Sequence, residues 1–214
     1  MAKLARLEKH LSAGNTGLVL FDALNGYLHP NDPTKVQFLA ERNILRNLQR
    51  LLAGARNVGM TVFYPSGAHA PDSADSVDRL TDTDMDLAQG GDAERPIRPH
   101  FYAGSRDAEI APELTPAKTD VIVTKQRWSS FFQTNLDLQL RARGIGTIVI
   151  AGGSTDVGIA STVFAARDLD YGIVVLRDAC YSTRGTNNDF FMDRVFPRMS
   201  RVMMVDQAVA LMSR

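Results

Sequence analysis

Six short runs of apolar residues recur along the chain, and segments with helical periodicity separate them. Nearly continuous apolar runs of this length are typical of strands that are buried on both faces, as in a parallel sheet. Strands that alternate with helices through right-handed crossovers predict a doubly wound, mainly parallel α/β sheet with helices on both faces. The predicted strands are Gly17–Phe21, Thr61–Tyr64, Asp120–Thr124, Thr147–Ala151, Ile173–Leu176 and Val202–Val205.

A long helix is predicted between the first two strands. Asp32 is placed to cap it, Pro33 suits its first turn, and the segment ends at Gly59. Apolar residues between these points recur at steps of three and four, which gives the helix one face for the core. Those residues are Ile44, Leu48, Leu51, Ala55 and Val58.

Two further helices are predicted in the second half of the chain. One runs from about Phe132 to Arg143, with Thr134 as a candidate amino-terminal cap, and stops at Gly144. The other begins near Thr155 and runs toward Asp168. Each lies between two predicted strands, as the crossovers of a parallel sheet require.

The segment from Pro65 to Lys118 interrupts this alternation. It is rich in Asp, Pro and Gly, and it contains the acidic stretch Asp82 to Asp86. A segment of this length is too long for a plain connection, so we predict an excursion with short helices that covers a binding cleft. No domain boundary is evident, and we expect a single domain over residues 1–214.

Composition narrows the classes of function. Lys plus Arg and Asp plus Glu both number 24 among the 214 residues, so no net charge attracts the chain to nucleic acid or to a membrane surface. No apolar run approaches the roughly 20 residues of a membrane span, and the amino terminus lacks the apolar centre of a secretory signal. The single cysteine, Cys180, excludes an internal disulfide. These features predict a cytoplasmic protein with no nucleic-acid or membrane partner.

Polar residues follow three of the predicted strands. Asp22 follows the first strand, Lys125 follows the third, and the loop Gly152 to Gly158 follows the fourth and opens a helix. Ligands of open parallel sheets bind outside the carboxyl ends of the strands, so these residues are expected to meet at one edge.

The sequence of the loop argues against nucleotide binding. A dinucleotide fingerprint that starts at Gly152 requires glycine where the chain has Ser154 and Val157. A triphosphate loop requires Lys and then Ser or Thr directly after Gly158, where Ile and Ala follow. The interpretation that remains is a group of backbone N–H donors at a helix start, suited to an oxyanion or a carboxylate.

Four stretches together resemble the isochorismatase-like hydrolase superfamily, also called the cysteine hydrolases. They are Asp22 after an apolar strand, TKQRWSSFFQTNLDLQLRARGI around Lys125, TIVIAGGSTDVGIASTVFAARDLDYGIVVLRDA, and RVFPRM near the carboxyl end. The resemblance covers almost the whole chain and implies a Rossmann-like, three-layer sandwich around six parallel strands. It also implies a homodimer or homotetramer that hydrolyses a small molecule, often through an Asp, Lys, Cys triad. Asp22 and Lys125 match the first two members of that triad.

The chain departs from this family at Gly158. Members commonly have T-x-x-C at the helix start, where this chain has Thr155, Asp156, Val157 and Gly158. Cys180 follows a different strand and is interpreted as a small buried residue rather than a replacement nucleophile. A covalent acyl-enzyme route therefore has no evident nucleophile, unless the glycine was introduced to silence the enzyme.

Within the family, isochorismatases that cleave a vinyl ether do not need the cysteine, because the aspartate can protonate the enol carbon. The leading hypothesis is such a hydrolase, with Asp22 as general acid and base, Lys125 offsetting charge, and the Ser154 and Gly158 N–H groups holding a substrate oxygen. An alternative is an amide or ureide hydrolase in which Asp22 activates water. A third is a catalytically silent homologue that binds a small molecule or a partner protein.

The resemblance and the position of a few side chains give further expectations. The family implies a cis peptide bond between Gly153 and Ser154. Tyr27 and Trp128 are candidates for contact with a planar substrate. Only His69 lies near the place where some relatives hold a metal, and one ligand makes no site, so we predict neither a metal nor a cofactor.

Overall fold

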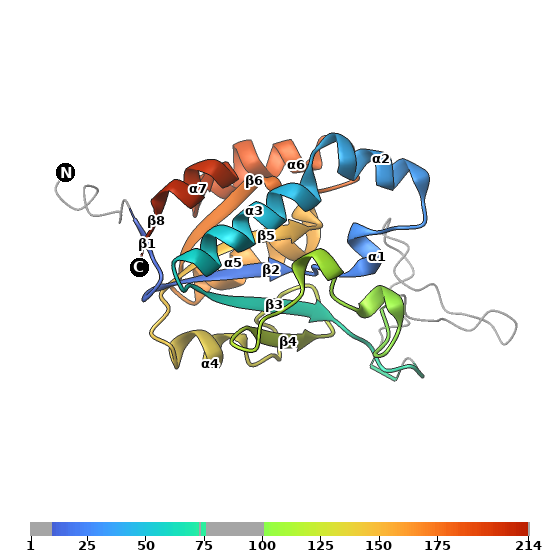
Figure 1. Cartoon of the computed structure of the whole chain (residues 1–214), viewed down its shortest axis with the longest axis horizontal. Coiled ribbons are helices and arrows are strands. Elements are labelled where there is room, and N and C mark those ends of the chain that lie inside the picture. Colours follow the sequence, from blue (N-terminus) through green and yellow to red (C-terminus); the bar gives the residue numbers. More distant parts are fainter. Residues whose placement is uncertain (1–9, 73, 76–100, 214) are drawn as a thin grey trace, which may run out of the picture.

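The computed structural model describes residues 10–72, 74–75 and 101–213 (Figure 1). All six predicted strands are present in it. They form one parallel sheet in the order β4-β3-β2-β5-β6-β7. The sixth strand is shorter than predicted, because Val205 begins a helix, and the fifth continues beyond Leu176. The strands are β2 Thr16–Phe21, β3 Thr61–Gly67, β4 Val121–Lys125, β5 Thr147–Gly153, β6 Gly172–Tyr181 and β7 Arg201–Met203.

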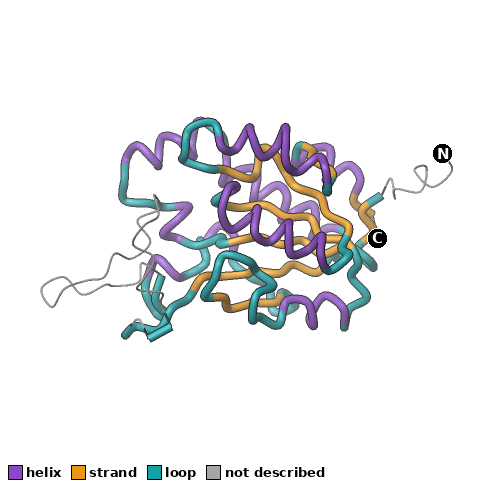
Figure 2. Tube along the Cα trace, turned by 180° about the vertical axis from the view of Figure 1, so that it is seen from behind, coloured by secondary structure: helices purple, strands orange, loops and turns teal. Residues whose placement is uncertain are grey.

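Helices cover both faces of this sheet, which confirms the predicted three-layer α/β architecture (Figure 2). Alternate residues of each strand enter opposite cores, since side chains of a strand alternate between its faces. On β2, Leu18 and Leu20 enter the core shared with α3 and α7, whereas Val19 and Phe21 enter the core shared with α4 and α5. The helices are α3 Ile44–Asn57, α7 Val205–Leu211, α4 Leu136–Arg141 and α5 Ala160–Asp168.

The predicted long first helix is wrong in one respect, because it is two helices. α2 covers Pro33–Glu41, and α3 begins at Ile44 after Asn43, whose φ of 53° is left-handed. Asparagine tolerates this conformation better than most residues, and it breaks a right-handed helix. The predicted cap is confirmed, because the Asp32 side chain accepts a hydrogen bond from the Thr34 N–H.

The two later helices differ in how well they were predicted. α4 begins at Leu136, four residues after the predicted start, and Gln133 has a left-handed φ of 53° in the turn before it. The Thr134 hydroxyl nevertheless accepts from the Leu136 N–H, as a cap does. The other helix begins at Thr155 as predicted, first as the π-helical turn η4 Thr155–Ile159 and then as α5.

The excursion after β3 contains short helices where it is described. Its later part holds the 3₁₀ turns η2 Arg106–Ala108 and η3 Pro112–Leu114, whereas the acidic stretch Asp82 to Asp86 lies outside the described residues. It passes beside the chain that follows β2, where the Ala111 N–H donates to the Ala23 carbonyl. The excursion therefore lies next to the segment that carries Asp22.

The remaining elements complete the edges of the structure. Within the described residues, no helix is long and apolar enough to cross a membrane. The remaining elements are β1 Leu11–Ser12, α1 Asn25–Leu28, α6 Asn187–Phe190, η5 Phe191–Val195, η6 Phe196–Arg198 and β8 Met212–Ser213.

Candidate active site

An aspartate and a lysine form a buried ion pair at the carboxyl edge of the sheet. The Lys125 Nζ lies 2.9 Å from Asp22 Oδ2, and each residue is only 5 % exposed. β3 lies between their strands, so the lysine side chain must cross one strand, and strands are about 4.8 Å apart. Asp22 and Lys125 therefore lie together at one edge of the sheet, as predicted.

The backbone holds the Asp22 carboxylate from a second direction. Its Oδ1 accepts a hydrogen bond of 2.8 Å from the Gly67 N–H, at the end of β3. The Asp22 backbone has a left-handed φ of 44°, and its own N–H donates to the Pro65 carbonyl at 2.9 Å. Such a conformation is uncommon for a residue with a side chain, and it turns the carboxylate out of the strand direction toward β3 and β4.

Phe21 and Gly158 form the side of the site next to this pair. The Lys125 Nζ lies 4.4 Å from the centre of the Phe21 ring, within the range of a cation–π contact. A Cβ atom built on Gly158 would lie 2.2 Å from Phe21 Cζ and 2.4 Å from Cε1. The ring therefore occupies the space in which any side chain at position 158 would begin.

The loop between β5 and α5 has the predicted cis peptide bond between Gly153 and Ser154. The N–H groups of Val157 and Ile159 donate to the Ser154 carbonyl, and the Gly158 carbonyl accepts from the Thr162 hydroxyl. The Ser154 hydroxyl donates to the Asp156 carboxylate. The Ser154 side chain is thus engaged within the loop, and the use of its N–H in substrate binding stays a prediction.

The Asp156 carboxylate connects this loop to α6. It also accepts a hydrogen bond of 2.6 Å from the Asn187 amide, on α6. Burial of the carboxyl raises its pKa, but hydrogen bonds from Ser154, Asn187 and Ser182 outweigh that effect and hold the pKa below its usual range. Asp156 therefore accepts hydrogen bonds as a carboxylate at neutral pH.

Two tyrosine hydroxyls belong to the surroundings of Asp22. Burial raises the pKa of both Tyr27 and Tyr181, and the charge of Asp22 raises each further. The Tyr27 ring stacks on Phe101 at 4.3 Å, so one of its faces is already covered by the protein. The Tyr181 hydroxyl is buried and has no hydrogen-bond partner within the part of the chain that is described.

Tyr181 was missed from sequence. It lies at the end of β6, paired in register with Gly153, and a Cβ on Gly153 would lie 2.4 Å from its Cζ. The tyrosine ring therefore packs directly on the loop that follows β5. A tyrosine at the end of a strand could have indicated a site residue. The predicted strand, however, ended at Leu176, five residues before the observed end of β6 at Tyr181.

The remaining candidate from the sequence is Trp128, whereas Cys180 was interpreted as a small buried residue. Trp128 is 47 % exposed, three residues after Lys125, and its role in a substrate pocket stays a prediction. The Cys180 thiol is buried within β6, where desolvation raises its pKa to about 12. A thiol of this kind is protonated near neutral pH and is not a nucleophile.

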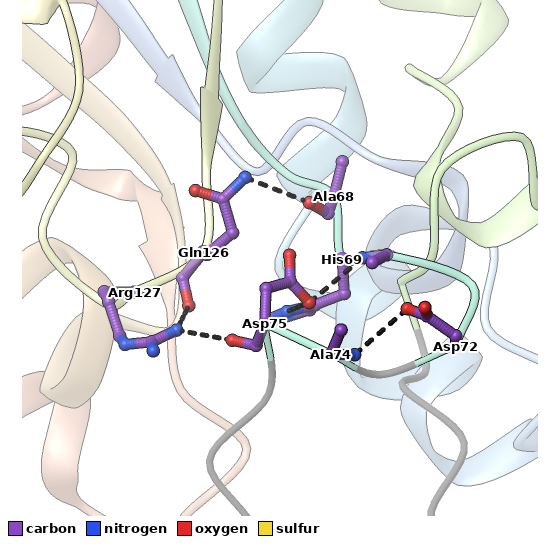
Figure 3. Close-up of polar contacts among 8 residues, drawn as sticks. Ala68, His69, Asp72, Ala74, Asp75, Gln126 and Arg127 are labelled. Atoms are coloured by element: carbon purple, nitrogen blue, oxygen red, sulfur yellow. Dashed lines mark hydrogen bonds and ion pairs between the residues drawn. The ribbon is translucent and has the colours of Figure 1, made fainter.

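His69 lies in the loop that follows β3 (Figure 3). Its Nδ1 is 3.3 Å from the Asp75 carboxylate, and the Arg127 guanidinium donates to the Asp75 carbonyl at 3.0 Å. Gln126 donates to the Ala68 carbonyl, so these contacts tie the segments after β3 and β4 together. Within residues 10–72, 74–75 and 101–213, no three His, Cys, Asp or Glu side chains are grouped to hold a metal ion.

Comparison with known proteins gives the family. The isochorismatase domain matches residues 16–207. The isochorismatase family protein YwoC of Bacillus subtilis is 37 % identical over 187 residues, which are 87 % of this chain and 88 % of YwoC. The ureidoacrylate amidohydrolase RutB of Variovorax paradoxus is 32 % identical, over 82 % of this chain and 72 % of RutB.

A solved structure supports the same assignment. An isochorismatase family protein from Burkholderia thailandensis superposes with a TM-score of 0.76 at 27 % identity, covering 92 % of this chain and 95 % of that protein. In this chain, Asp22 and Lys125 lie at the carboxyl edge of the six-stranded parallel sheet of that fold. This chain belongs to the isochorismatase family.

Proposed function

We propose that the protein is a hydrolase of a small organic molecule that acts without a cysteine nucleophile. Family membership and the amidohydrolase relative support a small-molecule hydrolase. Asp22 is its general acid and base, and Lys125 orients the Asp22 carboxylate and offsets its charge. The observation that carries this proposal is the buried ion pair of these two residues at the carboxyl edge of the sheet.

The cysteine content of the chain supports the absence of a covalent thioester route. Cys180 is the only cysteine in the sequence, and its buried thiol has a pKa raised to about 12. Position 158, where the resemblance places the nucleophile, is a glycine. Water is then the nucleophile, and Asp22 is the group placed to transfer its protons.

Cleavage of a vinyl ether fits this set of groups. In this route the Asp22 carboxylate first binds a proton and then donates it to the terminal enol carbon, which leaves an oxocarbenium ion at the ether carbon. Water adds to that carbon and returns a proton to Asp22, and the resulting hemiketal collapses to a carbonyl compound and an alcohol. The N–H groups of Ser154, which directly precedes η4, and of Gly158, within η4, hold an oxygen of the substrate in this scheme.

Hydrolysis of an amide or ureide is the second candidate, and the similarity to ureidoacrylate amidohydrolase RutB favours it. In this case Asp22 removes a proton from water, the hydroxide adds to the carbonyl carbon, and the same carboxyl protonates the departing nitrogen. Both reactions use Asp22 and Lys125 in the same places. They differ in whether a C–O or a C–N bond breaks.

The test is a substrate screen of the purified protein with two variants. Vinyl ethers, amides, ureides and cyclic imides are supplied in turn, and products are followed by mass spectrometry. Asp22→Asn should lower kcat by about 10²- to 10⁴-fold, the usual contribution of a general acid or base. The matched control Cys180→Ala should retain kcat within about 2-fold, because a protonated, buried thiol takes no part.

Two outcomes would contradict the proposal. Equal turnover by Asp22→Asn would remove Asp22 from the mechanism, and loss of turnover in a folded Cys180→Ala variant would make the thiol essential. No turnover of any of the four classes would favour a catalytically silent binding protein instead.

A further inference from the structure

The space beside Gly158 is filled by a neighbouring aromatic ring. Phe21 is 1 % exposed at the end of β2, and its Cζ and Cε1 lie 2.2 and 2.4 Å from where a Cβ on Gly158 would be. Contacts of Cβ atoms under 3 Å essentially never occur, and the ring belongs to a tightly packed core. Even alanine at position 158 would therefore require Phe21 to move.

The same ring contacts the Lys125 ammonium. The Lys125 Nζ lies 4.4 Å from the ring centre and 2.9 Å from Asp22 Oδ2, so the ammonium contacts an aromatic face and a carboxylate together. A ring face favours a cation that has been removed from water. Phe21 and Asp22 are consecutive residues, and thus one turn of backbone positions both groups around the ammonium.

We propose that Phe21 is a positioning residue, matched to Gly158, that occupies the place of a side-chain nucleophile and holds the Lys125 ammonium against Asp22. The protein then has a water-based reaction centre because the ring closes the position from which a thiol would attack. A cysteine at 158 cannot be accommodated while Phe21 keeps its place. This inference rests on the proposed function for its catalytic part, whereas the steric match of the two residues does not depend on it.

A double-mutant cycle on thermal unfolding tests the steric match without any substrate. Gly158→Ala should lower the Tm by about 5 °C, because overpacking of a dense core is destabilising. In a Phe21→Val background the same Gly158→Ala change should cost less than about 1 °C, since the added methyl group then replaces lost ring volume. Should Gly158→Ala fail to fold, recovery of folding in the double variant gives the same support.

One glycine and one phenylalanine elsewhere in the chain provide matched controls. Gly14→Ala adds a methyl group where the nearest atom, Ser12 Oγ, is 3.9 Å from the new Cβ, and it should leave the Tm within about 1 °C in both backgrounds. Phe63, on the neighbouring strand, is equally buried, enters the same core, and covers Gly17 instead. Phe63→Leu therefore removes a comparable ring away from Lys125.

The catalytic part is tested with the substrate that the screen identifies. Phe21→Leu should lower kcat at least about 10-fold with KM within 2-fold, because a misplaced ammonium affects the reacting groups more than substrate binding. Phe63→Leu should retain kcat within about 2-fold at a temperature where it is folded. Gly158→Cys should not form a covalent adduct with an acyl substrate, detectable as a mass increase of the intact protein.

The results separate this inference from the proposed function. Additive Tm changes in the cycle, or equal kcat losses in Phe21→Leu and Phe63→Leu, would overturn the role of Phe21 and leave Asp22 in place. Turnover that is independent of Asp22 would overturn the proposed function, and the Tm cycle would still report on the match of Phe21 with Gly158.

Discussion

The Lys125 ammonium reaches the Asp22 carboxylate across an intervening strand and lies 2.9 Å from it. That reach is possible because β3 ends in Gly67, which is paired in register with Lys125 and presents its N–H to the other carboxylate oxygen. Three neighbouring strands thus contribute one group each to a single buried contact. Removing any of these groups takes a hydrogen-bond partner from at least one of the others, in a place that water reaches poorly.

Loss of one member of the ion pair should cost more stability than loss of both. Lys125→Met leaves the buried Asp22 without its cation, and we expect the free energy of unfolding to fall by about 3–5 kcal/mol. Adding Asp22→Asn to Lys125→Met should restore part of that loss, because no unpaired charge remains. Urea denaturation of the two single variants and the double variant measures the difference.

A surface ion pair serves as the control for this cycle. Arg50 and Asp206 are paired between α3 and α7 with both side chains exposed, so Asp206→Asn should cost less than about 1 kcal/mol. A double variant that is as unstable as the sum of its single variants would show that Asp22 and Lys125 do not depend on each other.

Gly67 sets the size limit of the gap that Lys125 crosses. A Cβ at this position would lie 3.5 Å from Asp22 Oδ1 and 3.8 Å from Lys125 Nζ, which is ordinary contact. Gly67→Ala should therefore retain turnover within about 5-fold, whereas the branched side chain of Gly67→Val should displace the pair and lower kcat about 100-fold. Comparable kcat values for Ala and Val, measured on folded variants, would place the substrate-processing groups elsewhere.

The fold was predictable because its strands are buried on both faces. Runs such as Gly17–Phe21 and Thr147–Ala151 are apolar without interruption, and a surface strand would alternate with polar residues. The break of the first helix at Asn43 was not predictable from periodicity, because a left-handed residue leaves apolar spacing on either side almost unchanged. Local backbone conformation and hydrophobic pattern are separate kinds of information.

The charged half of the candidate site was predictable, whereas the role of Phe21 was not. Asp22 and Lys125 are conspicuous as polar residues at the ends of apolar strands. Phe21 looks like any other core residue in its strand, and its role depends on which atoms lie across from Gly158. That relation joins residues far apart in sequence, and strand patterns contain no information about it.

The Tyr181 hydroxyl gives a prediction in which a deletion stabilises the fold. It is buried without a hydrogen-bond partner in the described residues, and an unmade hydrogen bond of this kind costs about 1–3 kcal/mol. Tyr181→Phe should raise the Tm by about 2–4 °C for each kcal/mol regained. It should also lower kcat/KM about 10-fold, because we expect the substrate to supply the missing partner beside Asp22.

Tyr64 is the matched control for that change. Its hydroxyl is buried too, but it donates to the Leu114 carbonyl at 2.9 Å, so Tyr64→Phe should lower the Tm. Differential scanning calorimetry of both variants decides the comparison. A drop in Tm for Tyr181→Phe of the same size as for Tyr64→Phe would mean that the Tyr181 hydroxyl is satisfied in solution.

Acid should loosen the loop that carries Ser154, through Asp156. Hydrogen bonds hold the Asp156 pKa below that of the unfolded chain despite burial, so its contribution to stability is present above the unfolded pKa of about 4 and is lost as pH falls through the lower, folded pKa. The Tm of the wild-type protein should accordingly fall more steeply below about pH 4 than that of Asp156→Asn, whose side chain does not titrate. Asp168→Asn, at the exposed end of α5, should follow the wild-type curve. Parallel Tm curves for Asp156→Asn and the wild type between pH 7 and pH 2.5 would show that Asp156 has no such linkage, and the loop would then depend on other contacts for its acid stability.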